Sequence, residues 1–212
     1  MKILGIETSV KQSSAAIVVE NNSYEVFSDI KEDAAKSLPF IVENVLNKAQ
    51  SSFNDIDGIA ISMGPGSFTG LRVGLSYVKG LSLALDIPIV PISTFESMIN
   101  IVKPNPGKVI QTIIHSHGNA LYIAQHISKD KLYVLDSIPK IVDINDLKLK
   151  KDISIIYVGP NKIADQLNVK EMNNIQLTAL SIANLGYNNY DFLKTKSINN
   201  LAPNYIGSFK LD

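Results

Sequence analysis

One stretch of the chain decides the fold: residues 58–92 read GIAISMGPGSFTGLRVGLSYVKGLSLALDIPIVPI. Two short apolar runs, Gly58–Ser62 and Ile87–Ile92, are typical of buried strands. Between them, a glycine-rich loop leads into a segment from about Thr69 to Leu85 that has the length and composition of a helix. A strand, a helix and a second strand in this order form a crossover unit, which indicates an α/β fold.

The residues before this unit predict three strands and a first helix. Ile3–Ile6, Ser14–Val19 and Tyr24–Ile30 are β-like runs joined by short polar turns, as in an antiparallel meander. A helix follows Ser37, which we expect to cap it, because apolar residues recur there at the spacing of one helix face. These residues are Leu38, Ile41, Val42, Val45, Leu46 and Ala49.

A third helix is predicted after the unit, where Ser93 and Glu96 have the spacing of a capping box. The order βββ-α-β-α-β-α predicts a mixed sheet with helices on its faces, the ribonuclease-H-like arrangement, over residues 1–103. The helix-breaking cluster Lys103–Gly107 marks a boundary. We expect residues 108–212 to form a smaller α/β subdomain.

The second half predicts strands at Val109–His115, Ala120–Ile127, Leu132–Leu135 and Ile153–Val158, and helices at 161–167 and 178–187. A turn at Gly118–Asn119 would pair His115 with Tyr122. It would also place His126 opposite Gln111, so that these histidines and His117 do not converge on one metal ion.

Composition narrows the class of protein. The chain has 212 residues, 45% of them hydrophobic, and no cysteine, which excludes a disulfide scaffold, an iron–sulfur centre and a cysteine nucleophile. No apolar run reaches the roughly 18 residues of a membrane span. The first residues turn polar too soon for a signal peptide, so we expect a soluble, cytoplasmic protein without membrane contact.

Charge is unevenly placed along a chain whose net charge is zero. Residues 1–100 carry 7 basic and 11 acidic side chains, a net −4, and residues 101–212 carry 13 and 9, a net +4. Lysines of the basic half, such as Lys148, either contact the phosphates of a nucleic acid or only keep the surface solvated. Only one of the 20 cations is an arginine, Arg72, which indicates a position where lysine cannot replace the planar guanidinium.

The loop that opens the second helix has two interpretations. Backbone N–H groups at the start of a helix can hold an anion, which makes this a candidate anion- or nucleotide-binding loop. Its residues are Gly64, Gly66, Ser67 and Thr69. A tight turn that only starts the helix explains the same residues. The sequence matches neither a Walker A loop, which needs a lysine after the last glycine, nor a nucleophile elbow around Ser67.

Gly66, Gly70 and Gly74 lie four residues apart and form one row on the predicted helix. Each glycine within a helix lowers helix stability by about 1 kcal/mol relative to alanine, so some other interaction must compensate for this glycine row. Close approach of a second helix supplies it, and that helix belongs either to a partner protein or to the chain itself. We favour a partner, and on that basis expect Gly74→Leu to abolish complex formation while leaving the fold intact.

Four segments resemble one protein family: ILGIETS at 3–9, SLPFIVENVL at 37–46, GPGSFTGLRVG at 64–74 and IPIVPIST at 87–94. They resemble the TsaB (YeaZ) family of bacterial tRNA threonylcarbamoyladenosine biosynthesis proteins. The string GPGSFTGxRxG is specific to that family and contains Arg72. The resemblance covers the first half of the chain well and the second half in outline.

The resemblance implies a fold, a role and partners. The family has the actin/sugar-kinase/Hsp70-like fold of two related subdomains, of which the second is shortened here. It implies a non-catalytic subunit that docks through a helix pair on the catalytic paralogue TsaD and is joined by the small ATPase TsaE. tRNA is expected to meet this chain only through the complex. ATP and a metal ion are expected on the partner subunits, with no cofactor held by this chain, and a homodimer is expected when the chain is alone.

The resemblance also assigns residues. The partner interface would consist of Leu38, Ile41, Val45, Gly66, Gly70, Leu71, Arg72, Gly74, Leu75 and Val78. TsaD carries two metal-ligating histidines at the start of its corresponding helix, and the resemblance places Thr94 and Met98 at these positions. Neither side chain binds such a cation well, so no metal site is expected.

The main alternative function is that of a free-standing nucleotide-dependent phosphotransferase or ATPase of the same fold. Such an enzyme needs a glycine-rich first hairpin for phosphate, a base and a full second domain. The hairpin Thr8–Ser13 contains no glycine, and the second half of the chain is short. We therefore favour the subunit over the enzyme.

Overall fold

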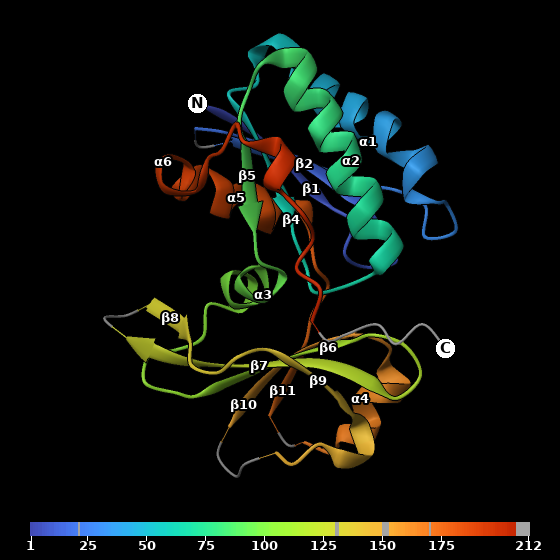
Figure 1. Cartoon of the computed structure of the whole chain (residues 1–212), viewed down its shortest axis with the longest axis vertical. Coiled ribbons are helices and arrows are strands. Elements are labelled where there is room, and N and C mark those ends of the chain that lie inside the picture. The colour runs from blue at the N-terminus through green and yellow to red at the C-terminus, as the bar shows by residue number, and fades with distance from the viewer. Residues whose placement is uncertain (21, 130–131, 150–152, 170, 207–212) are drawn as a thin grey trace. The chain divides into compact units, whose positions relative to one another are not determined.

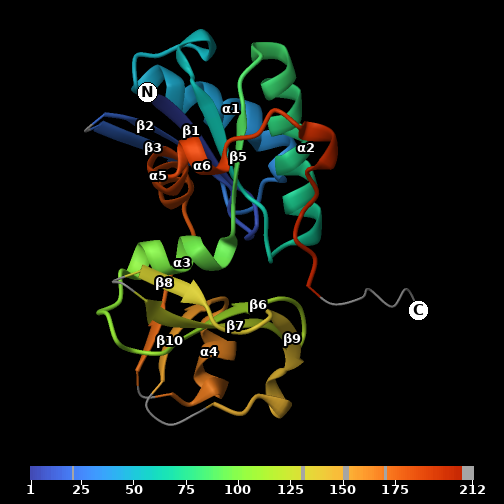
Figure 2. The same cartoon turned by 60° about the vertical axis from the view of Figure 1, so that its left-hand side comes forward.

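The computed structural model describes residues 1–20, 22–129, 132–149, 153–169 and 171–206 (Figures 1 and 2). The chain divides into two compact units. The first consists of Met1–Ser97 and Leu177–Asn204, and the second contains Met98–Gln176. These units differ from the predicted subdomains, because residues 177–204 were expected in the second and pack with the first.

A five-stranded sheet forms the centre of the first unit, in the order β3-β2-β1-β4-β5. β1 (Lys2–Glu7), β2 (Ser14–Val19) and β3 (Asn22–Phe27) form the predicted antiparallel meander. β4 (Gly58–Ser62) runs parallel to β1 on its other side, and β5 (Ile89–Ile92) runs parallel to β4. This mixed sheet confirms the predicted ribonuclease-H-like arrangement.

Helices cover both faces of this sheet (Figure 1). In β1, Leu4 and Ile6 point to one face and share a core cluster with α1 (Ala34–Lys48) and α2 (Phe68–Leu85). Ile3 points to the other face, where it packs with Ile182 of α5 (Ala179–Asn188). The apolar strands are therefore buried on both sides.

Small residues let α5 approach the sheet closely. A Cβ added to Gly5 of β1 would lie 2.7 Å from the Cβ of Ala183, and one added to Gly186 would lie 2.5 Å from the Cβ of Ala60. Neither position has room for a side chain. The sequence predicts this helix but not its return to the first sheet, since helical periodicity does not specify the surface on which a helix packs.

α1 begins three residues before the predicted cap. The N–H groups of Lys36 and Ser37 donate to the carbonyl oxygen of Asp33, which is the N-cap residue. Alanines at the next two positions favour helix and extend it upstream. Ser37 lies buried inside the helix, so its predicted capping role is wrong.

The second unit contains a six-stranded sheet with the path β11-β10-β6-β7-β8 and with β9 paired to β7. Its strands are β6 (Ile110–His115), β7 (Ala120–Lys129), β8 (Leu132–Leu135), β9 (Lys140–Asp143), β10 (Ser154–Val158) and β11 (Met172–Asn174). α4 (Asn161–Leu167) packs on this sheet through Ala164 and Leu167. β9 and β11 are not predicted from the sequence, because they are short and their residues are largely exposed.

The β6–β7 hairpin differs from its predicted register by one residue. His115 pairs with Leu121, and His126 pairs with Ile110. The loop is one residue longer than a two-residue turn, because the N–H of Ser116 donates to the carbonyl of Ala120. The predicted facing pairs of these histidines are therefore wrong.

The remaining elements are α3 (Thr94–Val102), α6 (Tyr190–Leu193) and the 3-10 helices η1 (Phe53–Asp55), η2 (Ile144–Asp146) and η3 (Ile198–Asn200). Glu96 of α3 accepts a hydrogen bond from the N–H of Ser93, as in one half of the predicted capping box. Over the described part of the chain, no helix is both long and apolar enough to cross a bilayer.

Candidate functional site

The glycine-rich loop after β4 is held by hydrogen bonds from two other parts of the first unit. The N–H of Ser67 donates to the carbonyl of Ser9 in the turn after β1, and the N–H of Asn204 donates to the carbonyl of Met63. The Ser67 hydroxyl caps α2 by accepting the N–H of Gly70 at 3.2 Å. The loop is thus fixed between the first turn and the C-terminal segment.

These bonds bear on the candidate anion-binding loop, whose residues are Gly64, Gly66, Ser67 and Thr69. An anion at a helix N-terminus is held by backbone N–H groups of the first turn. The N–H groups of Ser67 and Gly70 both have acceptors within the chain. A tight turn that starts α2 explains the geometry of the loop, and anion binding stays a prediction.

The glycine row faces the inside of the first unit. A Cβ added to Gly66 would overlap the carbonyl oxygen of Ser9, and one added to Gly70 would overlap that of Thr8. A Cβ added to Gly74 would overlap the Thr8 hydroxyl. Close packing does compensate for the low helix propensity of these glycines, but the segment that packs against them is the turn after β1 and not a second helix. The prediction that this row receives a partner helix is wrong.

The apolar residues assigned to the partner interface are also inside. Six of them are at most 5% exposed: Leu38, Ile41, Val45, Leu71, Leu75 and Val78. Five of the six belong to the core cluster beneath α1 and α2, and the sixth, Leu71, lies where a Cβ added to Gly64 would meet it at 3.0 Å. They stabilise the fold and expose almost no surface to another protein. Of the ten predicted interface residues, only Arg72 is exposed.

The outward side of the two helices offers a different surface. On α2, Arg72, Ser76, Gly80 and Ala84 lie four residues apart and are all exposed. Apart from its chain neighbours and the backbone of its own helix, no atom of the described residues lies within 4 Å of the position that a Cβ on Gly80 would take. We call these four residues the outer row. Sequence reasoning missed it, although its spacing equals that of the glycine row.

A groove and two large apolar side chains accompany the outer row. The groove has a volume of about 390 Å³ and is lined by Ala35, Leu38, Arg72, Val73, Ser76 and Tyr77. Leu83 of α2 is 69% exposed, and Phe40 of α1 is 67% exposed. Figures 1 and 2 show α1 and α2 side by side, and we call their outward sides together the helix-pair face. This helix-pair face is the candidate functional site.

Arg72 has a defined orientation on this face. Its guanidinium carbon lies 3.7 Å from the centre of the Phe68 ring, one turn earlier on α2. Stacking of this kind is favourable, and it keeps the planar group over the ring while its N–H groups stay at the edge. A lysine cannot make the same stacked, planar contact. The sole arginine of the chain lies on the outward side of α2, and its stacking on Phe68 agrees with the prediction that a lysine could not replace its planar group.

A buried carboxyl group lies beneath the glycine row. Glu7, at the end of β1, is fully buried, and burial raises its pKa. Its Oε1 accepts hydrogen bonds from the Ser9 N–H and, at 2.9 Å, from the Ser62 hydroxyl. The neighbouring Thr8 and Ser9 are also buried. Glu7, Thr8 and Ser9 are thus enclosed at the end of β1.

The histidines of the second unit do not form a site. His126 is 3% exposed, and burial lowers its pKa to about 4, so that it is neutral near pH 7. His115 is hydrogen-bonded through Nε2 to the carbonyl of Gly118 at 2.9 Å. Throughout the described residues, no three histidine or acidic side chains are grouped to hold a metal ion. Thr94 and Met98, where the resemblance places the TsaD ligands, are both completely buried.

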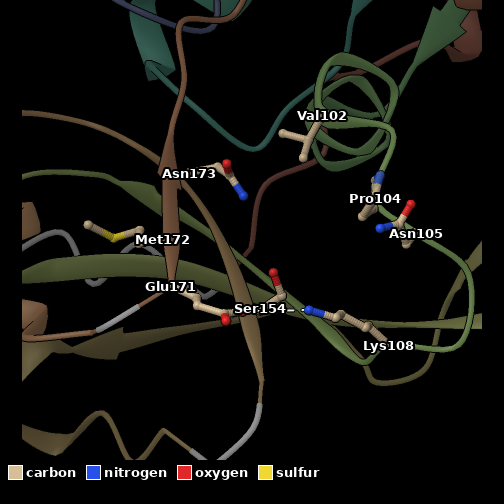
Figure 3. Close-up of a pocket in the computed structure, with 8 residues that line it drawn as sticks. All are labelled: Val102, Pro104, Asn105, Lys108, Ser154, Glu171, Met172 and Asn173. Atoms are coloured by element: carbon tan, nitrogen blue, oxygen red, sulfur yellow. Dashed lines mark ion pairs between the residues drawn. The ribbon is translucent and has the colours of Figure 1, made fainter.

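The second unit also contains an open pocket of about 400 Å³. Figure 3 shows Lys108 and Glu171 pointing toward each other in it, with 3.6 Å between the ammonium and the carboxylate. Both side chains are more than half exposed, and such surface ion pairs contribute about 0–1 kcal/mol. The pocket has no fixed charge that would select a ligand.

Comparisons with known proteins point to tRNA modification. The family model described as TsaD, tRNA N6-adenosine threonylcarbamoyltransferase, matches residues 28–172. The TsaB protein of Buchnera aphidicola subsp. Schizaphis graminum is 31% identical over 176 residues, covering 79% of this chain and 83% of that protein. The tRNA N6-adenosine threonylcarbamoyltransferase of Bacillus subtilis is 27% identical over 230 residues, covering 95% of this chain and 64% of that protein. YeaZ from Pseudomonas aeruginosa has the same fold, with a TM-score of 0.79 at 18% identity over 97% of this chain and 99% of that chain.

Proposed function

Since the chain belongs to the TsaB family of tRNA threonylcarbamoyladenosine biosynthesis proteins, we propose that it is a partner subunit that docks on a TsaD-like threonylcarbamoyltransferase and activates it. The observation that carries the proposal is the helix-pair face. Both helices already bury their inner sides in the core, yet α1 exposes Phe40, and α2 exposes Leu83 next to Ala84 of the outer row. Exposed apolar surface of this kind is typical of a protein interaction site.

The outer row suits a helix as the docking element. Ser76, Gly80 and Ala84 have short side chains or none, so a partner helix can approach the backbone of α2 closely. Leu83 and Phe40 would lose their contact with water when it docks, and burying a side chain of this kind contributes about 1.5–3 kcal/mol. The interface is therefore proposed at the predicted helix pair but on its opposite side.

We assign no catalytic role to this chain itself. The turn after β1 is packed against the glycine row, and Glu7 is held by Ser9 and Ser62 beneath it. A phosphotransferase of this fold needs that hairpin open to a nucleotide phosphate. These contacts argue against a free-standing phosphotransferase or ATPase. Activation of the TsaD-like subunit would come from holding it in its active arrangement.

The assembly would contain further partners. We propose that a TsaE-like ATPase joins it, that the partner subunits hold ATP and a metal ion, and that tRNA meets this chain through the complex. Without a TsaD-like paralogue, the helix-pair face of one copy would pair with that of a second, because an apolar face of this kind tends to be covered.

Gly80→Leu tests the proposal. The added side chain projects into open space in the monomer but into the path of a docked helix. Co-expression with the TsaD-like paralogue, size-exclusion chromatography with light scattering and a tRNA modification assay provide the readouts. The wild type should form a heteromeric complex and support modification, whereas Gly80→Leu should stay folded and fail in both.

Gln166→Leu is the matched control, because Gln166 is an exposed helical residue of α4 in the second unit. It should behave like the wild type. Normal complex formation by Gly80→Leu would exclude the helix-pair face as the docking surface. A wild-type chain that neither binds the paralogue nor supports modification would refute the proposed function.

A further inference from the structure

One oxygen atom of Glu7 is connected to both ends of the glycine-rich loop. Its Oε1 accepts a hydrogen bond at 2.9 Å from the hydroxyl group of Ser62, the last residue of β4. The same atom accepts the N–H of Ser9, and the carbonyl of Ser9 in turn accepts the N–H of Ser67. Ser62 lies directly before the loop, and Ser67 caps the helix after it. A single buried carboxyl group therefore connects the two ends of the loop.

The connection continues into α2. The Ser67 hydroxyl accepts the N–H of Gly70, and the Ser67 carbonyl accepts the N–H of Leu71. These hydrogen bonds start the helix, so they determine where its first turn begins. Arg72, the first residue of the outer row, follows directly. Because an α-helix has a fixed rise and rotation per residue, the position of its first turn affects the direction in which the outer row faces.

The two halves of the loop are held differently. In the first half, the carbonyl of Met63 accepts the N–H of Asn204. The second half is held through Ser9, whose carbonyl accepts the Ser67 N–H and lies so close to Gly66 that no side chain would fit there. Removing the acceptor of the Ser9 N–H should therefore release the second half of the loop, next to α2, more than the first half.

Burial makes the loss of this acceptor costly. Glu7 is fully buried, and Ser9 and Ser62 are at most 2% exposed. Solvent does not reach these groups in the folded chain, so a donor that loses the carboxyl oxygen stays unpaired. The N–H of Ser9 and the hydroxyl of Ser62 use the same oxygen. Both ends of the loop therefore depend on one atom.

We propose that Glu7 is a positioning residue for the helix-pair face, and that its Oε1 fixes the glycine-rich loop and the first turn of α2 in the orientation that a partner accepts. The inference rests on the proposed function, because the partner is the TsaD-like paralogue. Glu7 is buried and acts through Ser9 and Ser67. The apparent affinity of the face then depends on the fraction of molecules that have the loop in place.

Two substitutions separate the hydrogen bonds of Glu7 from its volume. Glu7→Met has a side chain of similar length without an oxygen acceptor, whereas Glu7→Gln keeps an oxygen at the same distance from the backbone. Native-state hydrogen exchange measured by NMR reports on the N–H groups of Ser9, Ser67 and Gly70. In Glu7→Met these groups should exchange about tenfold faster or more, as expected when a hydrogen bond to a carboxyl group is lost. Glu7→Gln should restore most of the protection.

Binding should follow the exchange rates. Isothermal titration calorimetry with the purified TsaD-like paralogue measures the dissociation constant of each variant. If one molecule in about ten keeps the loop in place, the apparent dissociation constant rises about tenfold, which is the effect expected for Glu7→Met. Glu7→Gln should bind nearly as tightly as the wild type. Ser62→Ala removes only the bond at the start of the loop and should have a smaller effect than Glu7→Met.

Ser14→Ala is the matched control. Ser14 lies opposite Glu7 on β2, and its hydroxyl accepts the N–H of Ala179 at 2.8 Å, at the start of α5. The substitution removes a buried hydrogen bond of the first unit without touching the loop. It should lower the midpoint of thermal unfolding and leave the exchange of the Gly70 N–H and the affinity for the paralogue unchanged.

Several results would overturn the inference. If Glu7→Met behaves like Ser14→Ala, with a lower midpoint but normal exchange at Gly70 and normal affinity, Glu7 only stabilises the core. Faster exchange with unchanged affinity would show that docking does not depend on the loop. An equal loss of affinity in Glu7→Gln would show that the oxygen acceptor is not the cause.

The failure of the proposed function would look different. A wild-type chain that does not bind the paralogue refutes docking, and with it the role of Glu7 in docking, whereas the exchange rates still decide whether Glu7 holds the loop. If Glu7→Met does not fold, Ser62→Ala takes its place in both measurements. Faster exchange and weaker binding in Ser62→Ala would then support the inference, and wild-type values in both would overturn it.

Discussion

Two glycines of α2 that are six residues apart should respond to the same substitution in opposite ways. Gly80→Leu places its side chain in open space, and glycine costs about 1 kcal/mol relative to good helix formers such as leucine. The variant should therefore be more stable by up to about 1 kcal/mol. In a chain of this size, that raises the midpoint of thermal unfolding by about 2–4 °C.

Gly74→Leu should unfold more readily than the wild type. The new Cβ would overlap the Thr8 hydroxyl and lie 3.2 Å from a methyl group of Ile61, before the rest of the leucine is added. Forcing extra atoms into a packed core costs about 1–3 kcal/mol, and more where a backbone turn must move. The gain in helix propensity offsets only part of this. The structure therefore reverses the earlier expectation that Gly74→Leu leaves the fold intact.

Differential scanning calorimetry of the isolated chain compares the two variants directly, without any partner. Gly80→Ala and Gly74→Ala form a second, gentler pair with the same expected signs. A higher midpoint for Gly74→Leu than for the wild type would show that the glycine row does not face the turn after β1. A marked loss of stability in Gly80→Leu would show that the outer row is covered within the monomer, and the helix-pair face would cease to be a site.

Two further predictions concern the buried histidine and the helix caps. Burial lowers the pKa of His126 to about 4 from 6.5, so on acidification the unfolded chain binds a proton at this histidine before the folded chain does. The contribution of His126 to the free energy of unfolding should be complete above about pH 6.5 and should be lost as the pH falls toward 4. His126→Gln should flatten this pH dependence when it is measured by urea unfolding. Ser67→Ala should lower the free energy of unfolding by about 1 kcal/mol, because Ser67 caps α2 through the Gly70 N–H. Ser37→Ala should cost less, since Ser37 lies inside α1 and caps nothing; an equal loss in the two serine variants would contradict the assignment.

The first unit was largely predictable because its signals are local. The meander, the crossover through α2 and the mixed sheet follow from apolar runs and turns that are adjacent in sequence. The turn after β1 is different, since Thr8 and Gly70 are far apart in the chain and no periodicity links them. Four-residue spacing is present on both sides of α2, in the glycine row and in the outer row. Spacing alone therefore could not tell which side is buried.

Arg72 was the one interface residue correctly placed on the surface, and the reason was chemical. Its rarity indicated a role for its planar side chain, whereas the other assignments relied on apolar residues that a folded core also requires. An apolar helix residue is more often part of its own core than of an interface. Exposed Leu83 and Phe40 could be recognised only once the inner sides of both helices were known.

α5 comes late in the sequence, and this affects how the first unit folds during synthesis. Ala179 follows Ile92, the end of the first sheet, by 87 residues (179 − 92), so the ribosome releases all five strands of that sheet long before the helix that covers their second face. Until α5 has been synthesised, Ile3, Ala60 and Val90 lack the helix that covers them in the folded unit. A nascent fragment that stops near residue 103 lacks one cover of this sheet, and the first unit is completed only after Leu177–Asn204 have been synthesised.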